Sequence, residues 1–169
     1  MALRHVLQDL RDRLTLLGAD PGPEHQAGAI PYTVVDGQPV FLIITSRRSG
    51  RWIFPKGAPV EGVAPWELAK KEAFEEAGVE GEIEHAPIGS YRTMKTLAIR
   101  RQPIEVDLYP LRVTRQHADW PEKGSRHRHW AILPEAKRLL SDKRLCELAA
   151  RLARRVAGET QPTMELIKK

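Results

Sequence analysis

Residues Gly57–Val79 read GAPVEGVAPWELAKKEAFEEAGV and predict a loop followed by one helix. We expect the helix to begin near Pro65, because the missing N–H of proline is unpaired in a first helical turn anyway. We expect it to end at Gly78, because glycine readily adopts the left-handed conformation that follows a helix. On a helical wheel, one stripe is apolar and should face the rest of the protein. Its members are Trp66, Ala69, Ala73 and Ala77.

Three glutamates, Glu72, Glu75 and Glu76, form the neighbouring stripe at spacings of three and four residues. Like charges at these spacings repel by about 0.2–0.5 kcal/mol per pair, and acids in the last turns oppose the helix dipole. A divalent metal ion bound by oxygen ligands would compensate for both effects. The alternative is a solvated acidic face that Lys70 and Lys71 partly neutralise, and the helix alone does not decide between the two.

This segment resembles the Nudix box, whose pattern is Gly, five residues, Glu, seven residues, then Arg-Glu-apolar-x-Glu-Glu-x-Gly-apolar. The positions in register are Gly57, Glu72, Glu75, Glu76, Gly78 and Val79. Lys71 replaces the arginine of the pattern, and Ala73 is a small residue at an aliphatic position. Val63 stands where the pattern has its first glutamate, so Lys71 has no carboxylate there with which to pair.

The resemblance implies hydrolysis of a diphosphate linkage by water, assisted by Mg²⁺ or Mn²⁺. It implies that Glu72 and Glu76, one helical turn apart, hold the metal together with the backbone carbonyl of Lys56. Glu75 is expected to orient or deprotonate the attacking water, with Glu72 as the alternative. Gly57 lets the chain turn tightly beside the metal.

Composition bounds the class of protein. The 169 residues suit one domain with a real core, and no apolar run is long enough to span a bilayer. The single cysteine, Cys146, excludes an intramolecular disulfide framework and fits a reducing compartment, so we expect a cytoplasmic protein without a membrane partner. A net charge of +5 favours polyanionic ligands without choosing among them. The sequence leaves the oligomeric state open.

The chain divides into three predicted parts. Residues 1–26 are expected to form an amphipathic helix, with leucines at three- and four-residue spacings, and a Pro/Gly linker. Residues 27–157 are expected to form the Nudix domain, and residues 158–169 a polar tail.

Within the domain, Asp36-Gly37 predicts a hairpin turn, and residues 92–102 predict a second, longer hairpin. Strands are expected at 29–35, 40–45, 83–91, 104–113 and 130–132, with helical periodicity from Pro134 onward. This order fits an α/β (α+β) fold with a mixed sheet, and the resemblance implies the Nudix α/β/α sandwich over residues 27–140.

Basic side chains are the expected phosphate contacts, because guanidinium and ammonium groups match phosphate oxygens. Any one of them could also be ordinary solvated surface. The substrate-binding candidates are Ser46, Arg47, Arg48, Arg51, Gly57, Arg92, Arg126 and Arg128. His127 and His129 alternate with two of these arginines, but they lack zinc-type spacing.

The flanks at residues 45–47, 51–53 and 124–130 look like diphosphoinositol polyphosphate phosphohydrolases, which also cleave diadenosine polyphosphates. That resemblance implies phosphate contact for Ser46, Arg47 and Arg126. The chain departs from it at Lys56-Gly57-Ala58, where those relatives have a glycine run.

Two further functions stay open. The basic charge balance permits a pyrophosphohydrolase acting on the 5′ end of RNA, although the chain has no aromatic-rich basic segment. Val63 motivates a catalytically inactive Nudix-like domain that binds a nucleotide or a protein. The three intact acids argue against that second alternative.

Overall fold

The computed structural model describes residues 23–97 and 100–160 of the chain. The predicted N-terminal helix and nearly all of the predicted polar tail lie outside these ranges. The first strand begins at Glu24, three residues before the predicted start of the domain. Within the described ranges, no helix combines the length and the apolar composition needed to cross a membrane.

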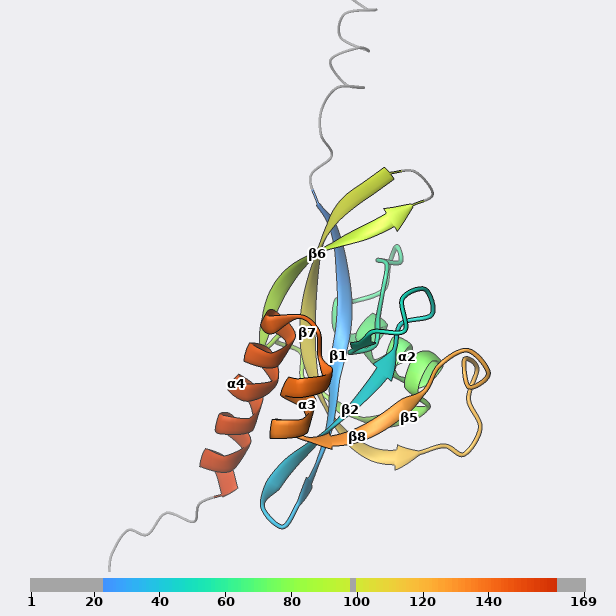
Figure 1. Ribbon diagram of the computed structural model, residues 1–169. Coiled ribbons are helices and arrows are strands. Elements are labelled where there is room, and N and C mark those ends of the chain that lie inside the picture. The colour runs from blue at the N-terminus through green and yellow to red at the C-terminus, as the bar shows by residue number, and fades with distance from the viewer. Residues whose placement is uncertain (1–22, 98–99, 161–169) are drawn as a thin grey trace, which may run out of the picture.

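A mixed sheet forms the centre of the described structure (Figure 1). Five strands follow one another in the order β3-β2-β1-β7-β5, while β4 pairs with β1, β6 with β7 and β8 with β2. The β1–β7 pair is parallel and the other pairs are antiparallel. The bounds are β1 Glu24–Val35, β2 Gln38–Thr45, β3 Trp52–Ile53, β4 Lys56–Gly57, β5 Val79–Ile83, β6 Gly89–Leu97, β7 Arg100–Gln116 and β8 Arg128–Ile132.

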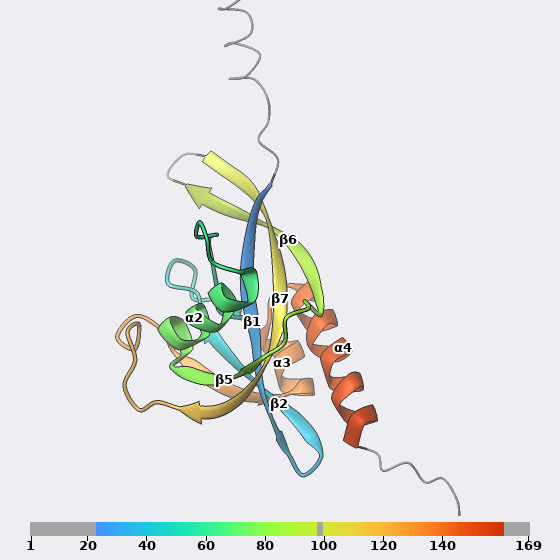
Figure 2. The same ribbon diagram turned by 180° about the vertical axis from the view of Figure 1, so that it is seen from behind.

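Helices cover both faces of this sheet (Figures 1 and 2). Helix α2, Pro65–Ala77, lies on one face. Helices α3, Leu133–Leu139, and α4, Lys143–Thr160, lie on the other. The predicted α/β/α arrangement is therefore confirmed.

The two predicted hairpins are present. Asp36 and Gly37 have φ values of 50° and 74°, as a two-residue turn with left-handed central residues requires. Strands β6 and β7 form the second hairpin, in which both strands reach further toward the turn than predicted.

The predicted strand at residues 83–91 is wrong. Strand β5 starts at Val79, directly after the end of α2, and ends at Ile83. The chain then leaves the sheet and returns as β6 at Gly89. Pro87 lies in this excursion, and a proline cannot donate a hydrogen bond to a neighbouring strand.

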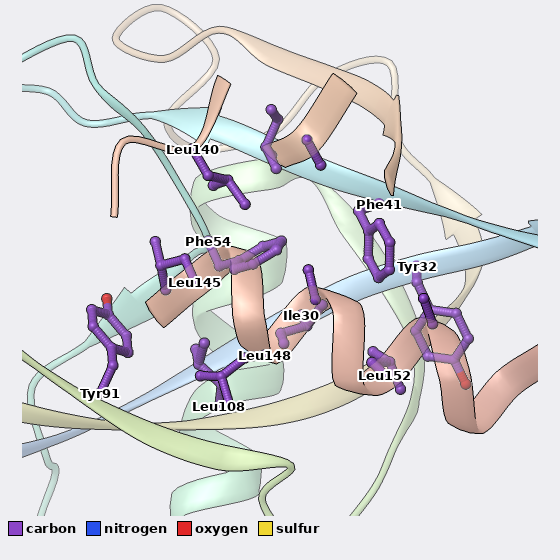
Figure 3. Packing of buried hydrophobic residues seen from close by; sticks show 14 of the residues in the cluster. Ile30, Tyr32, Phe41, Phe54, Tyr91, Leu108, Leu140, Leu145, Leu148 and Leu152 are labelled. Atoms are coloured by element: carbon purple, nitrogen blue, oxygen red, sulfur yellow. The ribbon is translucent and has the colours of Figure 1, made fainter. Parts of the chain in front are cut away.

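Two cores lie on opposite faces of the sheet, because successive strand residues point to alternate sides. Leu42 and Ile44 face α2, whereas Phe41 and Ile43 face α4. Figure 3 shows the α4-side core, in which Leu145, Leu148 and Leu152 of α4 gather around Phe54 and the sheet residues. This arrangement places the acidic helix α2 and the C-terminal helix α4 on different sides of the molecule.

Candidate active site

Helix α2 begins and ends where the sequence predicts. Pro65 occupies its first turn, and Gly78 follows it with φ 66°, donating its N–H to the Phe74 carbonyl at 2.9 Å. Ala69, Ala73 and Ala77 are fully buried, and their small side chains let the helix approach the sheet closely. Leu68, which the predicted stripe omits, is buried as well. Trp66 is only half-buried and stacks on His85.

Glu76 is the most deeply buried acid of this helix, with 7% of its surface exposed. One carboxylate oxygen accepts the backbone N–H of Lys56 in β4 at 3.1 Å. The other forms an ion pair with Arg126, which is equally buried and comes from the loop before β8. Glu76 thus ties α2 to two segments that lie far from it in the sequence.

Arg126 connects more than these two segments. It donates through Nη1 to the Thr45 carbonyl at the end of β2, at 3.0 Å, and through Nε to the carboxylate of Glu122. Glu122 also pairs with Arg47 at 3.4 Å, and its backbone N–H donates to the Glu75 carbonyl. The loop that carries Glu122 and Arg126, the end of β2 and helix α2 therefore meet at one point.

Glu122 is a site residue that the sequence analysis missed. No local pattern in the sequence singles it out, because its four-residue spacing to Arg126 would make the two side chains neighbours only in a helix, and they lie in a loop. It adds a carboxylate close enough to Glu72 and Glu76 to raise the pKa of both. The acidic character of the site is therefore stronger than the helix alone indicates.

Burial is the main cause that raises the pKa of these glutamates. It raises the pKa of Glu76 to about 7, with Glu72 and Glu122 adding to the rise, while Arg126 and the Lys56 N–H oppose it. The pKa of Glu72 is raised in the same direction, by burial first and by Glu75 second. Added positive charge at this point would relieve the cost of ionising both groups.

Glu72 lies directly against Gly57. A Cβ atom on Gly57 would clash with the Glu72 carboxylate, so a side chain there would displace Glu72 from its present position. Gly57 itself pairs with Ala27 of β1, which fixes the loop on the sheet. The structure therefore brings Glu72, Glu76, Lys56 and Gly57 together, as the resemblance implies.

The position where the box lacks its first glutamate is also visible. Val63 is exposed, and its N–H donates to the Val60 carbonyl at 3.1 Å. Lys71 pairs instead with Glu75 at 3.4 Å, one turn further along α2. Lys71 thus partly neutralises the acidic row of its own helix.

Arg128 lies at the C-terminal end of α2. Its guanidinium donates to the carbonyls of Ala77 and His117, both at 2.8 Å, and lies over the ring of Trp120 at 3.8 Å. Helix α2 has no basic residue in its last turn. Arg128 supplies the missing cation there, and substrate contact by this residue stays a prediction.

The other predicted phosphate contacts separate into two groups. Ser46 and Arg47 begin the β2–β3 loop and lie beside the Arg126 loop, since the Thr45 N–H donates to the His127 carbonyl and the Thr45 carbonyl accepts from Arg126 Nη1. Arg48 and Arg51 are exposed in the same turn. Arg92 is on β6, paired with Glu105 at 3.3 Å, with β7 and β1 between it and β4. The structure does not bring Arg92 to the acids.

The carboxylates fit a small hard cation. Among the described residues, no ready-made group of three or more His, Cys, Asp or Glu side chains is arranged around one metal position. Mg²⁺, however, binds proteins through one or two carboxylates and keeps several waters. Glu72 and Glu76 are one turn apart with raised pKa values, and Glu122 is nearby, so the donor set suits such an ion.

The sheet, the helices on its two faces and the acidic helix packed against a glycine loop together define the Nudix fold. A family model for the NUDIX domain matches residues 24–146. The chain therefore belongs to the Nudix hydrolase family, which confirms the prediction from the box.

Relatives by sequence are Nudix hydrolases. Nudix hydrolase 13, mitochondrial, from Arabidopsis thaliana is 28% identical over 154 residues, covering 73% of this chain and 74% of the relative. Diphosphoinositol polyphosphate phosphohydrolase 3-beta from Bos taurus is 32% identical over 103 residues, covering 60% and 59%. Nudix hydrolase 12, mitochondrial, from Arabidopsis thaliana is 31% identical over 102 residues, and the match spans only half of that protein.

Solved structures share the fold. A binary complex of the C. elegans Ap4A hydrolase superposes with a TM-score of 0.60 at 20% identity, covering 79% of this chain and 98% of that one. The E. coli dihydroneopterin triphosphate pyrophosphohydrolase superposes with a TM-score of 0.62 at 13% identity, covering 79% and 97%. At such identities the likeness establishes the fold class alone.

Proposed function

We propose that this protein hydrolyses a diphosphate linkage in a polyphosphorylated small molecule, of the inositol pyrophosphate or dinucleoside polyphosphate type. One observation carries the proposal: the acids Glu72 and Glu76 meet the basic side chains Arg126 and Arg47 at one point of the fold. Hydrolysis of a diphosphate uses both kinds of group. Carboxylates bind a cation and position the water, and positively charged side chains bind the phosphates. The names of the bovine and C. elegans proteins support this substrate class.

In this proposal Glu72 and Glu76, with the carbonyl of Lys56, would hold Mg²⁺ or Mn²⁺. When bound, the ion would neutralise phosphate charge and lower the pKa of a coordinated water. Glu75 would orient or deprotonate the attacking water, with Glu72 as the alternative. Glu75 has 37% of its side chain exposed against 8% for Glu76, and Lys71 holds its carboxylate at the surface of the site.

Arg47, Ser46 and Arg126 would bind the phosphates, with Arg48 and Arg51 on the same loop as further contacts. Arg47 has 60% of its side chain exposed, which leaves it free to reach a ligand. Arg126 is buried between Glu76 and Glu122, so a phosphate would compete with two carboxylates for the same N–H groups. Arg47 is therefore the primary phosphate contact in this proposal, and Arg126 is a secondary contact that also positions the acids.

A substrate panel with Mg²⁺ tests the proposal. It contains inositol pyrophosphates, diadenosine polyphosphates, ADP-ribose, nucleoside triphosphates and 5′-triphosphate RNA. We expect turnover of the first or second class, lost about 100-fold or more in Glu76→Gln, the scale typical of groups engaged in the chemical step. Glu82→Gln, an exposed glutamate on β5, is the matched control and should keep full activity.

Two other outcomes would replace the proposal. Turnover confined to 5′-triphosphate RNA would support the RNA pyrophosphohydrolase. Absence of any turnover by the native protein, together with unchanged stability on addition of Mg²⁺ or Mn²⁺, would support an inactive binding domain and make Val63 the residue to explain.

We also propose a cytosolic location, on the basis of the single cysteine Cys146. Several of the plant relatives are named mitochondrial, so the two compartments are the natural comparison. Fractionation of the cells that make the protein measures this, and recovery in the mitochondrial fraction would contradict it.

A further inference from the structure

A second charged cleft lies between the start of β6 and helix α4. It has a volume of about 470 Å³. Its lining consists of Gly89, Ser90, Arg144, Glu147, Leu148, Arg151 and Arg154. Small-molecule sites occupy roughly 300–1,000 Å³, so the cleft is large enough for a ligand of that kind.

The cleft is separate from the candidate active site. Gly89 pairs with Leu108, Leu108 with Gly28, and Gly28 with Lys56. Adjacent strands are about 4.8 Å apart, so these three steps place Gly89 about 14 Å from Lys56, whose backbone N–H donates to Glu76. In addition, α4 packs on the face of the sheet opposite α2 (Figures 1 and 2). One small ligand cannot fill both sites.

The charged lining forms one stripe of α4. Arg144, Glu147, Arg151 and Arg154 follow one another at spacings of three and four, which places them on one side of the helix. All four are exposed, whereas Leu148, which also lines the cleft, is buried at 7% exposure and packs into the α4-side core (Figure 3). The cleft is therefore lined by solvent-exposed arginines next to a buried leucine.

The positive charge of this stripe is only partly compensated within the protein. Arg151 donates through Nη1 to the Ile88 carbonyl at 2.9 Å, which fixes its guanidinium at the rim. The guanidinium groups of Arg144 and Arg154 form no hydrogen bond or ion pair with any described residue. Glu147 supplies one negative charge against three positive ones. By contrast, Arg155 on the next stripe is paired with Glu84.

Gly89 keeps the cleft open at the point where strand and helix meet. A Cβ atom there would lie 2.6 Å from Leu148 Cδ2 and 3.4 Å from Arg151 Nη1. A side chain at this position would therefore fill the space in front of the arginines or push Leu148 aside. The strand backbone itself forms that wall of the cleft.

We propose that this cleft binds a small phosphate-bearing anion through Arg144, Arg151 and Arg154, at a site distinct from the candidate active site. Guanidinium groups match phosphate oxygens in geometry and charge, and an anion would relieve the repulsion among three arginines on one helix. The limited volume of the cleft, about 470 Å³, favours a small molecule over an extended nucleic acid. The proposal does not depend on the proposed hydrolytic function.

Pyrophosphate in EDTA, which removes metal-dependent binding, is the probe for this site. We expect it to shift the amide NMR signals of Gly89 and Ser90 in a saturable manner. The double variant Arg144→Gln/Arg154→Gln should bind at these signals about tenfold more weakly, the scale of one or two charge-assisted hydrogen bonds. Glu147→Gln should bind more tightly, because it removes the opposing charge. Orthophosphate and adenosine diphosphate then distinguish inorganic ligands from nucleotides.

The matched control is Lys137→Gln/Arg138→Gln, which removes two exposed positive charges from α3. It should leave the Gly89 and Ser90 titration unchanged. Equal weakening in both double variants would mean that net charge alone attracts the probe, and would overturn the proposal. Unshifted Gly89 and Ser90 signals would overturn it as well. Any diphosphate hydrolysis should be unaffected by Arg144→Gln/Arg154→Gln, since neither residue belongs to the candidate active site.

Discussion

Helices α2 and α4 each carry a row of charged side chains, mainly acidic on α2 and mainly basic on α4, and the two rows differ in how far the rest of the protein compensates them. On α2, Glu76 is paired with Arg126 and Glu75 with Lys71, and Arg128 caps the end of the helix. On α4, Arg144 and Arg154 have no such partners among the described residues. A charged row at helical spacing is therefore not evidence of a ligand until its partners from the rest of the fold are counted.

This comparison also refines the argument for a cation on α2. From the helix alone, the acidic row could be offset either by a metal ion or in part by Lys70 and Lys71. The structure shows that side chains from the late loop offset part of it, whereas Glu72 has no ion pair with a described residue and its pKa is raised by burial and by Glu75. A cation would therefore relieve the cost of ionising Glu72 as well as that of Glu76, whose pKa is raised to about 7 despite Arg126.

The largest expected effect comes from breaking the buried pair on α2. Arg126→Ala should lower the free energy of unfolding by about 3–5 kcal/mol, because it leaves the Glu76 carboxylate buried without its partner. Denaturant unfolding in EDTA at pH 7.5 measures this. Arg47→Ala, which removes an exposed partner of Glu122, is the control and should cost no more than about 1 kcal/mol. Equal losses in the two variants would show that Arg126 is not the partner that stabilises the acids.

The second effect is a dependence of stability on pH. The pKa of Glu76 lies at about 7 in the folded protein, above its ordinary value of 4.5, so the folded state holds its proton more tightly. This contribution to stability is complete below pH 4.5 and is lost as the pH rises through 7. The free energy of unfolding of the metal-free protein should therefore fall by up to about 3 kcal/mol between pH 5 and 8.

Glu76→Gln should remove this contribution to the pH dependence, while Glu82→Gln should keep it. The groups facing Glu76 are Arg126, Glu72 and Glu122, and none of them changes in either variant. Mg²⁺ should restore part of the lost stability at pH 8, because a cation favours the ionised carboxylates. A native protein whose stability does not decrease over this range would contradict the assigned burial of Glu76.

A smaller effect is expected at the end of α2. Arg128→Met keeps an unbranched apolar side chain but removes the guanidinium that lies over Trp120 and donates to the Ala77 and His117 carbonyls. We expect a loss of about 1–3 kcal/mol in unfolding free energy, the cost of leaving half-buried carbonyls unpaired. The KM of the best substrate should not change if Arg128 only caps the helix. A raised KM with unchanged stability would instead support the predicted substrate contact.

The smallest effect on the free energy of unfolding is expected on α4, where a substitution should increase stability instead of lowering it. Arg154→Gln removes one of the uncompensated charges, so the free energy of unfolding should stay constant or rise by about 0.2–0.5 kcal/mol. Lys71→Gln on α2 is the counterpart and should lower stability by a similar amount, because Lys71 pairs with Glu75. Measured in low salt, opposite signs would support the contrast between the two rows. A loss of stability in Arg154→Gln would show that this arginine has a partner within the protein.

Local signals in the sequence were enough for the elements that carry the acids. Pro65, Gly78 and the alanine spacing define α2, and Asp36-Gly37 defines the first hairpin. The prediction of one strand at residues 83–91 is wrong because the apolar residues of this interval resemble those of a single strand. Only the pairing of β5 and β6 with different parts of β7 shows two strands.

The partners of the acids could not be predicted in the same way. Arg126 lies fifty positions from Glu76, and no periodicity connects them. Glu122 carries no pattern of its own, and its role follows only from the loop that brings it beside Arg47 and Arg126. Arg92 and Arg128 have the right charge, but sequence does not reveal which neighbours, Glu105 or the carbonyls of α2, their guanidinium groups meet.

The parallel pairing of β1 with β7 has a consequence for how the chain reaches its native state. Residues 24–32 pair with residues 104–112, so the central pair of strands forms only after most of the chain is available. Closing so long a loop slows folding, and proteins dominated by such distant contacts fold in milliseconds to seconds. During synthesis, β1 and the apolar stripe of α2 therefore remain without their partner strand until β7 has been synthesised. This interval is when the nascent protein most needs protection from aggregation.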